Sequence, residues 1–190
     1  MKNIAIFASG SGSNAEQIIR YFQQTKTACV KFIITDNKQA GVINRVKKLG
    51  VPSFYFSKED LANTESVIEF LQQNNIALIA LAGYLKKIPS TLIDTFPNSI
   101  INIHPALLPD FGGKGMYGIH VHEAVLKAQR KQSGISIHYV NNNFDEGEIV
   151  FQATCDVEKS DTPQLLAARV LELEHAHYAT IIDKVLKSEN

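Results

Sequence analysis

The feature that most constrains the fold is an alternation, through the first half of the chain, of short apolar runs with amphipathic segments of helical period. Residues 76–82 are apolar at every position, which is typical of a central parallel strand covered on both faces. Such alternation indicates a parallel sheet with right-handed helical crossovers. The periodicity predicts strands and helices in turn, with strands at 2–8, 29–35, 53–56, 76–82 and 99–103 and helices at 14–24, 40–49 and 64–74.

The second half of the chain has a different pattern. A helix is expected over 118–131, and then two strands, 134–140 and 149–157, follow without a helix between them, which predicts antiparallel pairing. Thr162 and Pro163 form an N-cap and a first helical position for a helix that reaches about Leu186. We therefore expect an α/β fold: a doubly wound, mostly parallel sheet, Rossmann-like in its N-terminal half, with an antiparallel C-terminal extension. The length of 190 residues suggests one domain, 1–190.

Charge and cysteine content exclude several classes of protein. The 19 basic residues balance 19 acidic ones, so a general nucleic-acid-binding surface is not expected. Cys29 and Cys155 lie far apart without paired spacing, which argues against a disulfide framework or a cysteine zinc site and fits a reducing compartment. The sequence shows neither a signal peptide nor an apolar run of about 18 residues. We expect a cytoplasmic protein without a membrane or nucleic-acid partner.

A glycine-rich loop, residues 9–14 (Ser-Gly-Ser-Gly-Ser-Asn), joins the first predicted strand to the first helix. Glycines allow a ligand to approach the backbone, and the N–H groups at a helix start bind anions. The segment matches the G-x-G-x-x-A dinucleotide pattern, with Asp36 as a candidate ribose ligand. A dinucleotide, a smaller phosphate and a capping turn without a ligand all remain open as interpretations. Donors on Ser13 and Asn14 favour a small phosphate.

A second motif, Asn102-Ile-His104-Pro105, ends a predicted strand. Asn102 and His104 project from the same face because side chains alternate along a strand, and Pro105 ends the extended segment. Ligands of open α/β sheets bind at this carboxyl edge. An amide and an imidazole together can stabilise an oxyanion, and the imidazole can act as a general acid. The alternative is structural: a histidine that caps the strand and an asparagine bonded to backbone.

Asp145 lies in the Asn- and Gly-rich segment 141–147 between two predicted strands. Such residues form turns, which by itself explains their presence. A carboxylate here could nevertheless reach His104, raise its pKa and orient a water molecule for proton transfer.

Two His-x-His pairs, at 120/122 and 175/177, lie in predicted helices. Residues two apart do not share a helix face, so we do not expect a chelating pair or a metal.

Several motifs in order along the chain resemble the phosphoribosylglycinamide formyltransferases, the folate-dependent family of the third step of purine synthesis. They are the loop 9–14, Leu81-Ala-Gly-Tyr84, Asn102-Ile-His-Pro-Ala-Leu-Leu-Pro109, His120-x-His122, Ser136-Ile-His138, Asp145-x-Gly147 and Glu174-His175. The resemblance implies a single formyltransferase domain. It also implies transfer of the formyl group of 10-formyltetrahydrofolate, as co-substrate, to the amine of glycinamide ribonucleotide.

The resemblance implies roles for particular residues. Asn102 and His104 would hold the tetrahedral intermediate, with His104 as proton donor and Asp145 assisting. The ribonucleotide would lie on Gly12, Ser13, Asn14 and Glu174. The folate would lie against Leu85, Lys86, Lys87, Ile88, Asn102, Asn141, Asn142, Asn143, Phe144 and Asp145. No metal is required, the partners are small molecules, and the protein is expected to be a monomer or homodimer.

This chain departs from the family pattern at three places. Lys86 stands where the best-known members have Arg, which removes a planar fork but keeps the charge. No Arg for the folate tail occurs near 63–66. The loop 110–118 is longer and Gly-rich, which indicates a mobile lid or a tolerated insertion, and its Lys114 could reach a phosphate or the folate glutamate.

Two alternatives remain open. A formyltetrahydrofolate deformylase or methionyl-tRNA formyltransferase would share the chemistry, but each normally carries a further domain for which this chain has no room. A dinucleotide-binding oxidoreductase would leave Asn102, His104 and Asp145 unexplained.

Overall fold

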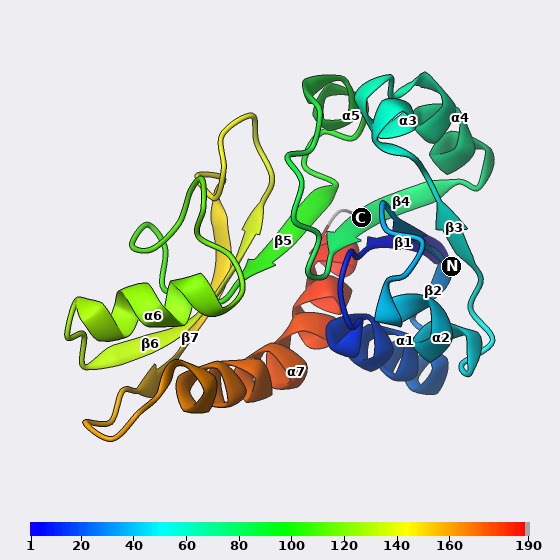
Figure 1. The fold of residues 1–190 in the computed structure, drawn as a ribbon. Coiled ribbons are helices and arrows are strands. Elements are labelled where there is room, and N and C mark those ends of the chain that lie inside the picture. The colour runs from blue at the N-terminus through cyan, green and yellow to red at the C-terminus, as the bar shows by residue number, and fades with distance from the viewer. Residues whose placement is uncertain (189–190) are drawn as a thin grey trace.

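The computed structural model describes residues 1–188 and contains one seven-stranded sheet with helices on both faces (Figure 1). The strands are β1 (Lys2–Phe7), β2 (Ala28–Thr35), β3 (Ser53–Tyr55), β4 (Ile76–Leu81), β5 (Ile100–His104), β6 (Gln132–Tyr139) and β7 (Ile149–Asp156). The helices are α1 (Ser13–Thr25), α2 (Gly41–Lys47), α3 (Lys58–Ala62), α4 (Glu65–Gln73), α5 (Ser90–Thr95), α6 (Ile119–Lys127) and α7 (Pro163–Ser188).

The sheet has the order β3-β2-β1-β4-β5-β6-β7. All pairs among the first five strands are parallel, whereas β6 pairs antiparallel with β5, and β7 pairs antiparallel with β6. The predicted fold class is therefore confirmed. The order in which strands are added reverses between β1 and β4: β2 and β3 lie on one side of β1, and β4 and β5 lie on the other. Such a switch point opens a crevice at the carboxyl ends of the strands.

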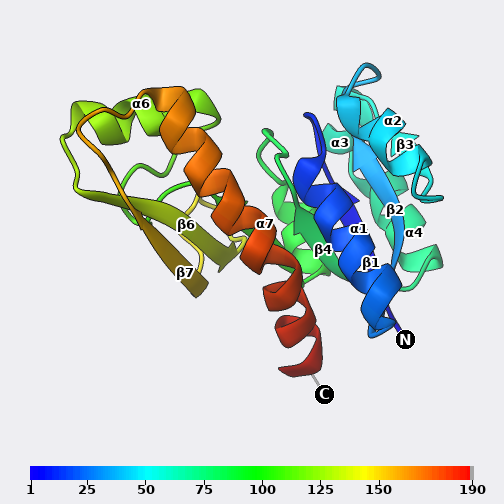
Figure 2. The same cartoon turned by 90° about the horizontal axis from the view of Figure 1, so that it is seen from below.

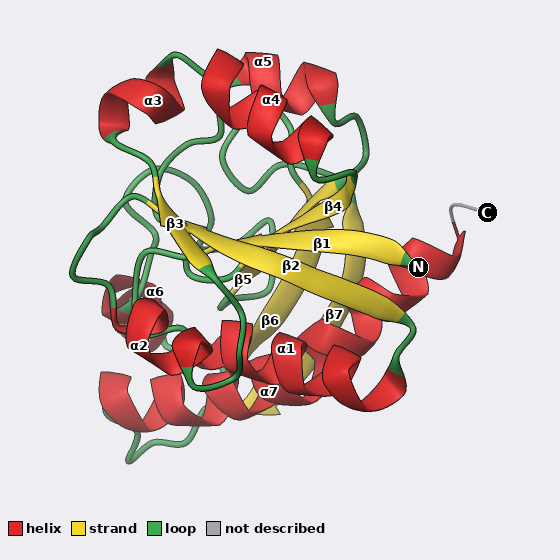
Figure 3. Ribbon diagram, turned by 90° about the vertical axis from the view of Figure 1, so that its right-hand side faces the viewer, coloured by secondary structure: helices red, strands yellow, loops and turns green. Residues whose placement is uncertain are grey.

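Two apolar layers enclose the sheet. Figure 3 shows α3, α4 and α5 over one face and α1, α2 and α7 over the other. Successive residues of β1 point to opposite faces, so Ile4 and Ile6 join the layer under α1 and α7, while Ala5 and Phe7 join the layer under α4. All four are fully buried, as expected for a central strand with both faces covered.

The C-terminal helix α7 connects the two parts of the sheet. It runs from the β6–β7 part to α1 (Figure 2). Its start is the predicted cap, because the Leu165 N–H donates to Thr162 Oγ1 at 3.2 Å. Deeper in the molecule, the buried Tyr178 hydroxyl lies 2.9 Å from the Leu81 carbonyl and 3.2 Å from that of Ile101. This side chain ties α7 to the end of β4, where the crevice opens, and to the first half of β5.

Three features differ from the sequence prediction. The helices α3 and α5 were not expected, since five and six residues are too few to show a helical period. The helix predicted over 118–131 is wrong at its end: α6 stops at Lys127, and β6 already begins at Gln132.

Within residues 1–188, no helix is long and apolar enough to cross a membrane.

Candidate active site

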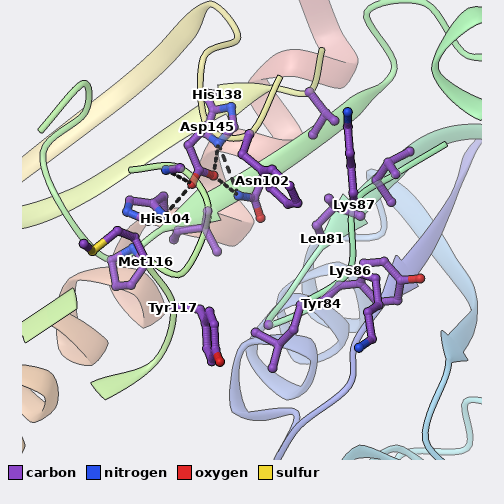
Figure 4. A pocket seen from close by; sticks show the side chains of 18 of the residues that line it. Leu81, Tyr84, Lys86, Lys87, Asn102, His104, Met116, Tyr117, His138 and Asp145 are labelled. Carbon is purple, nitrogen blue, oxygen red and sulfur yellow. Dashed lines mark hydrogen bonds and ion pairs between the residues drawn. The ribbon is translucent and has the colours of Figure 1, made fainter. Parts of the chain in front are cut away.

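A cavity of about 410 Å³ lies at the carboxyl ends of β4 and β5. Side chains from α1, from the segments after β4, β5 and β6, from the glycine-rich loop 110–118 and from α7 line it (Figure 4). The predicted site residues among the lining are Asn14, Leu85, Lys86, Lys87, Ile88, Asn102, His104, Asn141, Asn143, Phe144, Asp145 and Glu174. Gly12, Ser13 and Asn142 are predicted site residues that do not line it.

Asn102 and His104 lie at the end of β5, as the sequence predicted, but their orientation depends on β6. The antiparallel register places His138 opposite Asn102. His138 Nδ1 lies 2.8 Å from the Tyr139 carbonyl, which can only accept, so Nδ1 carries a hydrogen and donates. In the neutral ring Nε2 then accepts from Asn102 Nδ2, 3.2 Å away. His138 thereby sets the direction of the Asn102 amide, a role the sequence analysis did not assign to it.

Asp145 lies between the two imidazoles (Figure 4). Its carboxylate oxygens are 3.6 Å from His104 Nδ1 and 3.6 Å from His138 Nε2, and one of them accepts from the Gly113 N–H at 2.9 Å. Burial opposes ionisation of this carboxyl, but the two imidazoles and the Gly113 N–H outweigh burial and lower the pKa of Asp145. Asp145 is therefore a carboxylate at neutral pH, and the turn residue reaches His104.

His104 is 3% exposed, and this burial affects its protonation. Burial penalises the imidazolium and lowers the pKa of His104 below 6.5, although Asp145 and the Phe111 carbonyl act in the opposite direction. The contribution of Asp145 to the His104 pKa thus has the predicted sign, but desolvation by burial is larger, and the pKa falls. Nε2 donates to the Phe111 carbonyl at 2.8 Å, so the ring contacts the loop 110–118 directly.

The predicted folate segments face each other across the cavity. Leu85 and Phe144 are exposed at 53% and 40%, although both are apolar, and the Lys87 ammonium lies 6.0 Å from the Phe144 ring centre. Exposed apolar side chains beside a cavity are typical of a binding site. The loop 110–118, noted for its glycines, also contributes Lys114, Met116 and Tyr117. The cavity-lining residues that sequence analysis did not assign are Leu81, Gly83, Tyr84, Ile103, Pro105, Gly113, Gly115, Met116, Tyr117, Gly118, His138 and Val140.

The first glycine-rich loop, residues 9–14, enters α1 through Gly12, whose φ of 78° suits glycine. A Cβ at this position would lie 2.4 Å from Val42 Cγ2 on α2. The loop therefore requires glycine for both its conformation and its packing. Asp36, the candidate dinucleotide residue, accepts a 2.6 Å hydrogen bond from Ser9 within the same region.

Asn14 connects α1 to α7. Its Nδ2 donates to Glu174 Oε2 at 2.5 Å, while its Oδ1 is buried without a hydrogen-bond partner in the described part of the chain. Burial raises the pKa of Glu174 to about 7, against the opposing effect of Asn14. An unsatisfied buried acceptor and a carboxyl with a raised pKa in one cavity wall are typical of a site that a polar ligand completes.

The first His-x-His pair is divided between two environments. His120 is exposed and lies 3.2 Å from Glu123, whereas His122 is 4% exposed. The two rings therefore lie on different faces of α6, as the spacing predicted.

Comparison with known proteins agrees with this fold and identifies the family of the chain. A family model described as formyl transferase matches residues 2–182. The chain therefore belongs to the formyl transferases, a family that uses a formylated folate as co-substrate.

The relatives narrow the family further. The chain is 36% identical to the phosphoribosylglycinamide formyltransferase of Bacillus subtilis, over 100% of this chain and 97% of that protein. It is 39% identical to the chloroplastic enzyme of that name from Arabidopsis thaliana, over 97% of this chain but only 65% of the plant protein. Within the formyl transferases, the chain belongs to the phosphoribosylglycinamide formyltransferase family.

Solved structures of the same family have the same fold as this chain. Glycinamide ribonucleotide transformylase 1 from Geobacillus kaustophilus superposes with a TM-score of 0.90 at 32% identity, over 98% of this chain and 99% of that one. The phosphoribosylglycinamide formyltransferase from Bacillus halodurans gives 0.88 at 34% identity, over 100% and 97%.

Proposed function

We propose that the chain transfers the formyl group of 10-formyltetrahydrofolate to the amine of glycinamide ribonucleotide. The observation that supports this most directly is the convergence of Asn102, His104 and Asp145 at one end of the cavity, with Asp145 within 3.6 Å of one imidazole and 3.5 Å of the amide. An amide donor, an imidazole and a carboxylate are the groups that acyl transfer to an amine requires.

In the proposed reaction, the amine attacks the formyl carbon, a C–N bond forms, and the formyl oxygen becomes an oxyanion that Asn102 and His104 stabilise. One hydrogen of the Asn102 amide is bonded to His138, and the other points toward Asp145 across a long contact of 3.5 Å. Because this second hydrogen is weakly held, it is the one offered to the oxyanion. The bond to the folate nitrogen then breaks, and the proton lost by the amine passes to that nitrogen through His104, assisted by Asp145.

The ribonucleotide is proposed to lie with its phosphate on Gly12, Ser13 and Asn14. The first N–H groups of a helix as long as α1 attract an anion. The Glu174 carboxyl, bonded to Asn14 in the same cavity wall, would accept hydrogen bonds from the sugar hydroxyls, and Asn14 Oδ1 would gain a partner.

The folate is proposed to lie between 85–88 and 141–145, with its pterin on backbone N–H and C=O groups. Lys86, Lys87 and Lys114 stand at the same cavity and would attract the acidic tail. This set would take the place of the Arg that is missing near 63–66. The proposal further includes one domain over 1–190, no metal in the reaction, and a monomer or homodimer.

A formyl-transfer assay tests the proposal. The protein is mixed with glycinamide ribonucleotide and 10-formyltetrahydrofolate, and deformylated folate is followed by absorbance. We expect turnover that requires the ribonucleotide and that falls by roughly 10²–10⁴-fold in His104→Ala and Asp145→Asn. The control is Asp94→Asn, an exposed carboxylate on α5, which should keep wild-type turnover.

Two outcomes would contradict the proposal. Folate release without an acceptor would indicate a deformylase. Absence of turnover together with NAD binding would indicate the dinucleotide alternative.

A further inference from the structure

The turn that follows the Asn102–His104 strand is held by two side chains from neighbouring strands. The Ser136 hydroxyl donates to the Ala106 carbonyl at 2.7 Å and accepts from the Leu108 N–H at 2.9 Å. The Gln152 amide donates to the Leu108 carbonyl at 3.0 Å and to the Ser136 hydroxyl at 2.8 Å. Ser136 is fully buried, so losing this hydroxyl would leave buried backbone groups unsatisfied.

The sheet register places these side chains in one row with the active-site histidine. Ser136 is opposite His104 on β6, and Gln152 is opposite Ser136 on β7. Directly opposite residues project from the same face of a sheet. The row therefore connects the edge strand to the strand end that carries His104.

The same turn leads into the loop that contacts both members of the proposed catalytic pair. Phe111 follows the turn closely, and its carbonyl accepts the hydrogen of His104 Nε2 at 2.8 Å. Gly113 donates to Asp145 at 2.9 Å. The position of the turn thus decides where the loop meets His104 and Asp145.

We propose that Ser136 and Gln152 are positioning residues for formyl transfer, which they support by fixing the turn 106–108 and hence the contacts of Phe111 and Gly113 with His104 and Asp145. Neither residue lines the cavity, so their effect passes through the loop and not through contact with substrate. The proposal rests on the formyl-transfer function proposed above.

The chain supplies a matched control on the same strand. Ser133 is also a buried serine of β6, at 2% exposure, but its hydroxyl has no hydrogen-bond partner among the residues described. Ser133→Ala therefore removes a hydroxyl of equal size from β6 without breaking a hydrogen bond. Ser136→Ala breaks the two bonds that join Ser136 to the turn and the bond from Gln152 to Ser136.

The experiment measures kcat, both KM values and the titration of the His104 ring by NMR in each variant. We expect Ser136→Ala to lower kcat by about tenfold or more, as misplacement of reacting groups does. Both KM values should stay within about twofold, because no substrate contact is lost. The His104 pKa should fall below its wild-type value, since a displaced Phe111 carbonyl no longer favours the imidazolium. Ser133→Ala should change none of these quantities.

Gln152→Ala keeps the test decisive if Ser136→Ala does not fold. Gln152 lies on the exposed edge strand, and its loss leaves the Ser136 bonds to Ala106 and Leu108 in place. It should lower kcat and the His104 pKa in the same direction by less, and the double variant should be non-additive because both residues hold Leu108.

A wild-type His104 titration in folded Ser136→Ala or Gln152→Ala, or an unchanged kcat, would overturn the positioning role. Failure of the proposed function is separate: the wild-type protein would then lack formyl transfer, while the NMR titration would still report on the turn.

Discussion

Asp145 shows at the scale of one residue how competing effects set the state of a site. It faces His104 and His138 at equal distance and keeps its negative charge against burial. His104 is more deeply buried, and for its ring burial outweighs the attraction of Asp145. At neutral pH the pair is therefore a carboxylate beside a neutral imidazole, a combination that can take up a proton from an attacking amine.

Replacing Asp145 tests this balance. Because Asp145 raises the pKa of His104 while burial lowers it, Asp145→Asn should lower the His104 pKa further below 6.5. NMR titration of the His104 ring measures the change, and Asp94→Asn serves as the control. An unchanged or higher pKa in Asp145→Asn would mean that the carboxylate does not interact with the ring.

At the scale of elements, the start of α1 depends on how closely α2 approaches it. Gly12 has a left-handed conformation, and Val42 occupies the space that a Cβ would need. Around Gly10, two residues earlier, a Cβ would meet no heavy atom within 4 Å. Two glycines of one loop therefore have different roles: one is required by packing, and the other is not.

This difference gives a prediction about α1. Gly12→Ala should destabilise the protein by more than about 1–2 kcal/mol, because the left-handed conformation alone costs that much and the overlap with Val42 adds to it. Urea unfolding measures the loss. The KM for the ribonucleotide should rise as the helix start shifts. Gly10→Ala should stay within about 0.5 kcal/mol of wild type. Equal losses in both variants would refute the packing argument.

At the scale of the whole molecule, α7 and the buried histidines couple the site to overall stability. α7 carries Glu174 at the cavity and Tyr178 beneath β4 and β5. Burial lowers the pKa of His104 and of His122, so unfolding at mildly acid pH takes up protons. Glu174 acts in the opposite sense, because its pKa in the folded protein is about 7, above the ordinary value of 4.5. Its contribution to the stability of the fold is therefore lost as pH rises through 7.

His122 offers the clearest test because its Nδ1 is buried with no partner within residues 1–188. Its folded pKa lies below 6.5, so it reduces stability as pH falls below 6.5. His122→Leu should weaken this acid-side loss by roughly 1.4 kcal/mol for each pH unit that separates the folded pKa from the unfolded one. Urea unfolding of both proteins from about pH 5 to pH 7.5 measures how the free energy of unfolding depends on pH. The difference near pH 7.5 gives the effect of the substitution on packing alone, since His122 is neutral there in both the folded and the unfolded chain. An unchanged slope would contradict the prediction.

The sequence by itself determined the order of the strands and of the longer helices, the mixed sheet, the glycine-dependent entry into α1 and the shared face of Asn102 and His104. Each of these follows from local periodicity or from the conformational limits of single residues. Short elements such as α3 and α5 lack enough residues for a period and were missed.

Only the tertiary structure decided which distant residues meet. The antiparallel register brings His138 to Asn102 and Ser136 to His104, and the turn after β6 carries Asp145 to both imidazoles. The net pKa direction of His104 likewise depends on how much solvent the packed loop and strands exclude. Contacts and desolvation of this kind arise between segments far apart in the chain, and no local pattern encodes their distance.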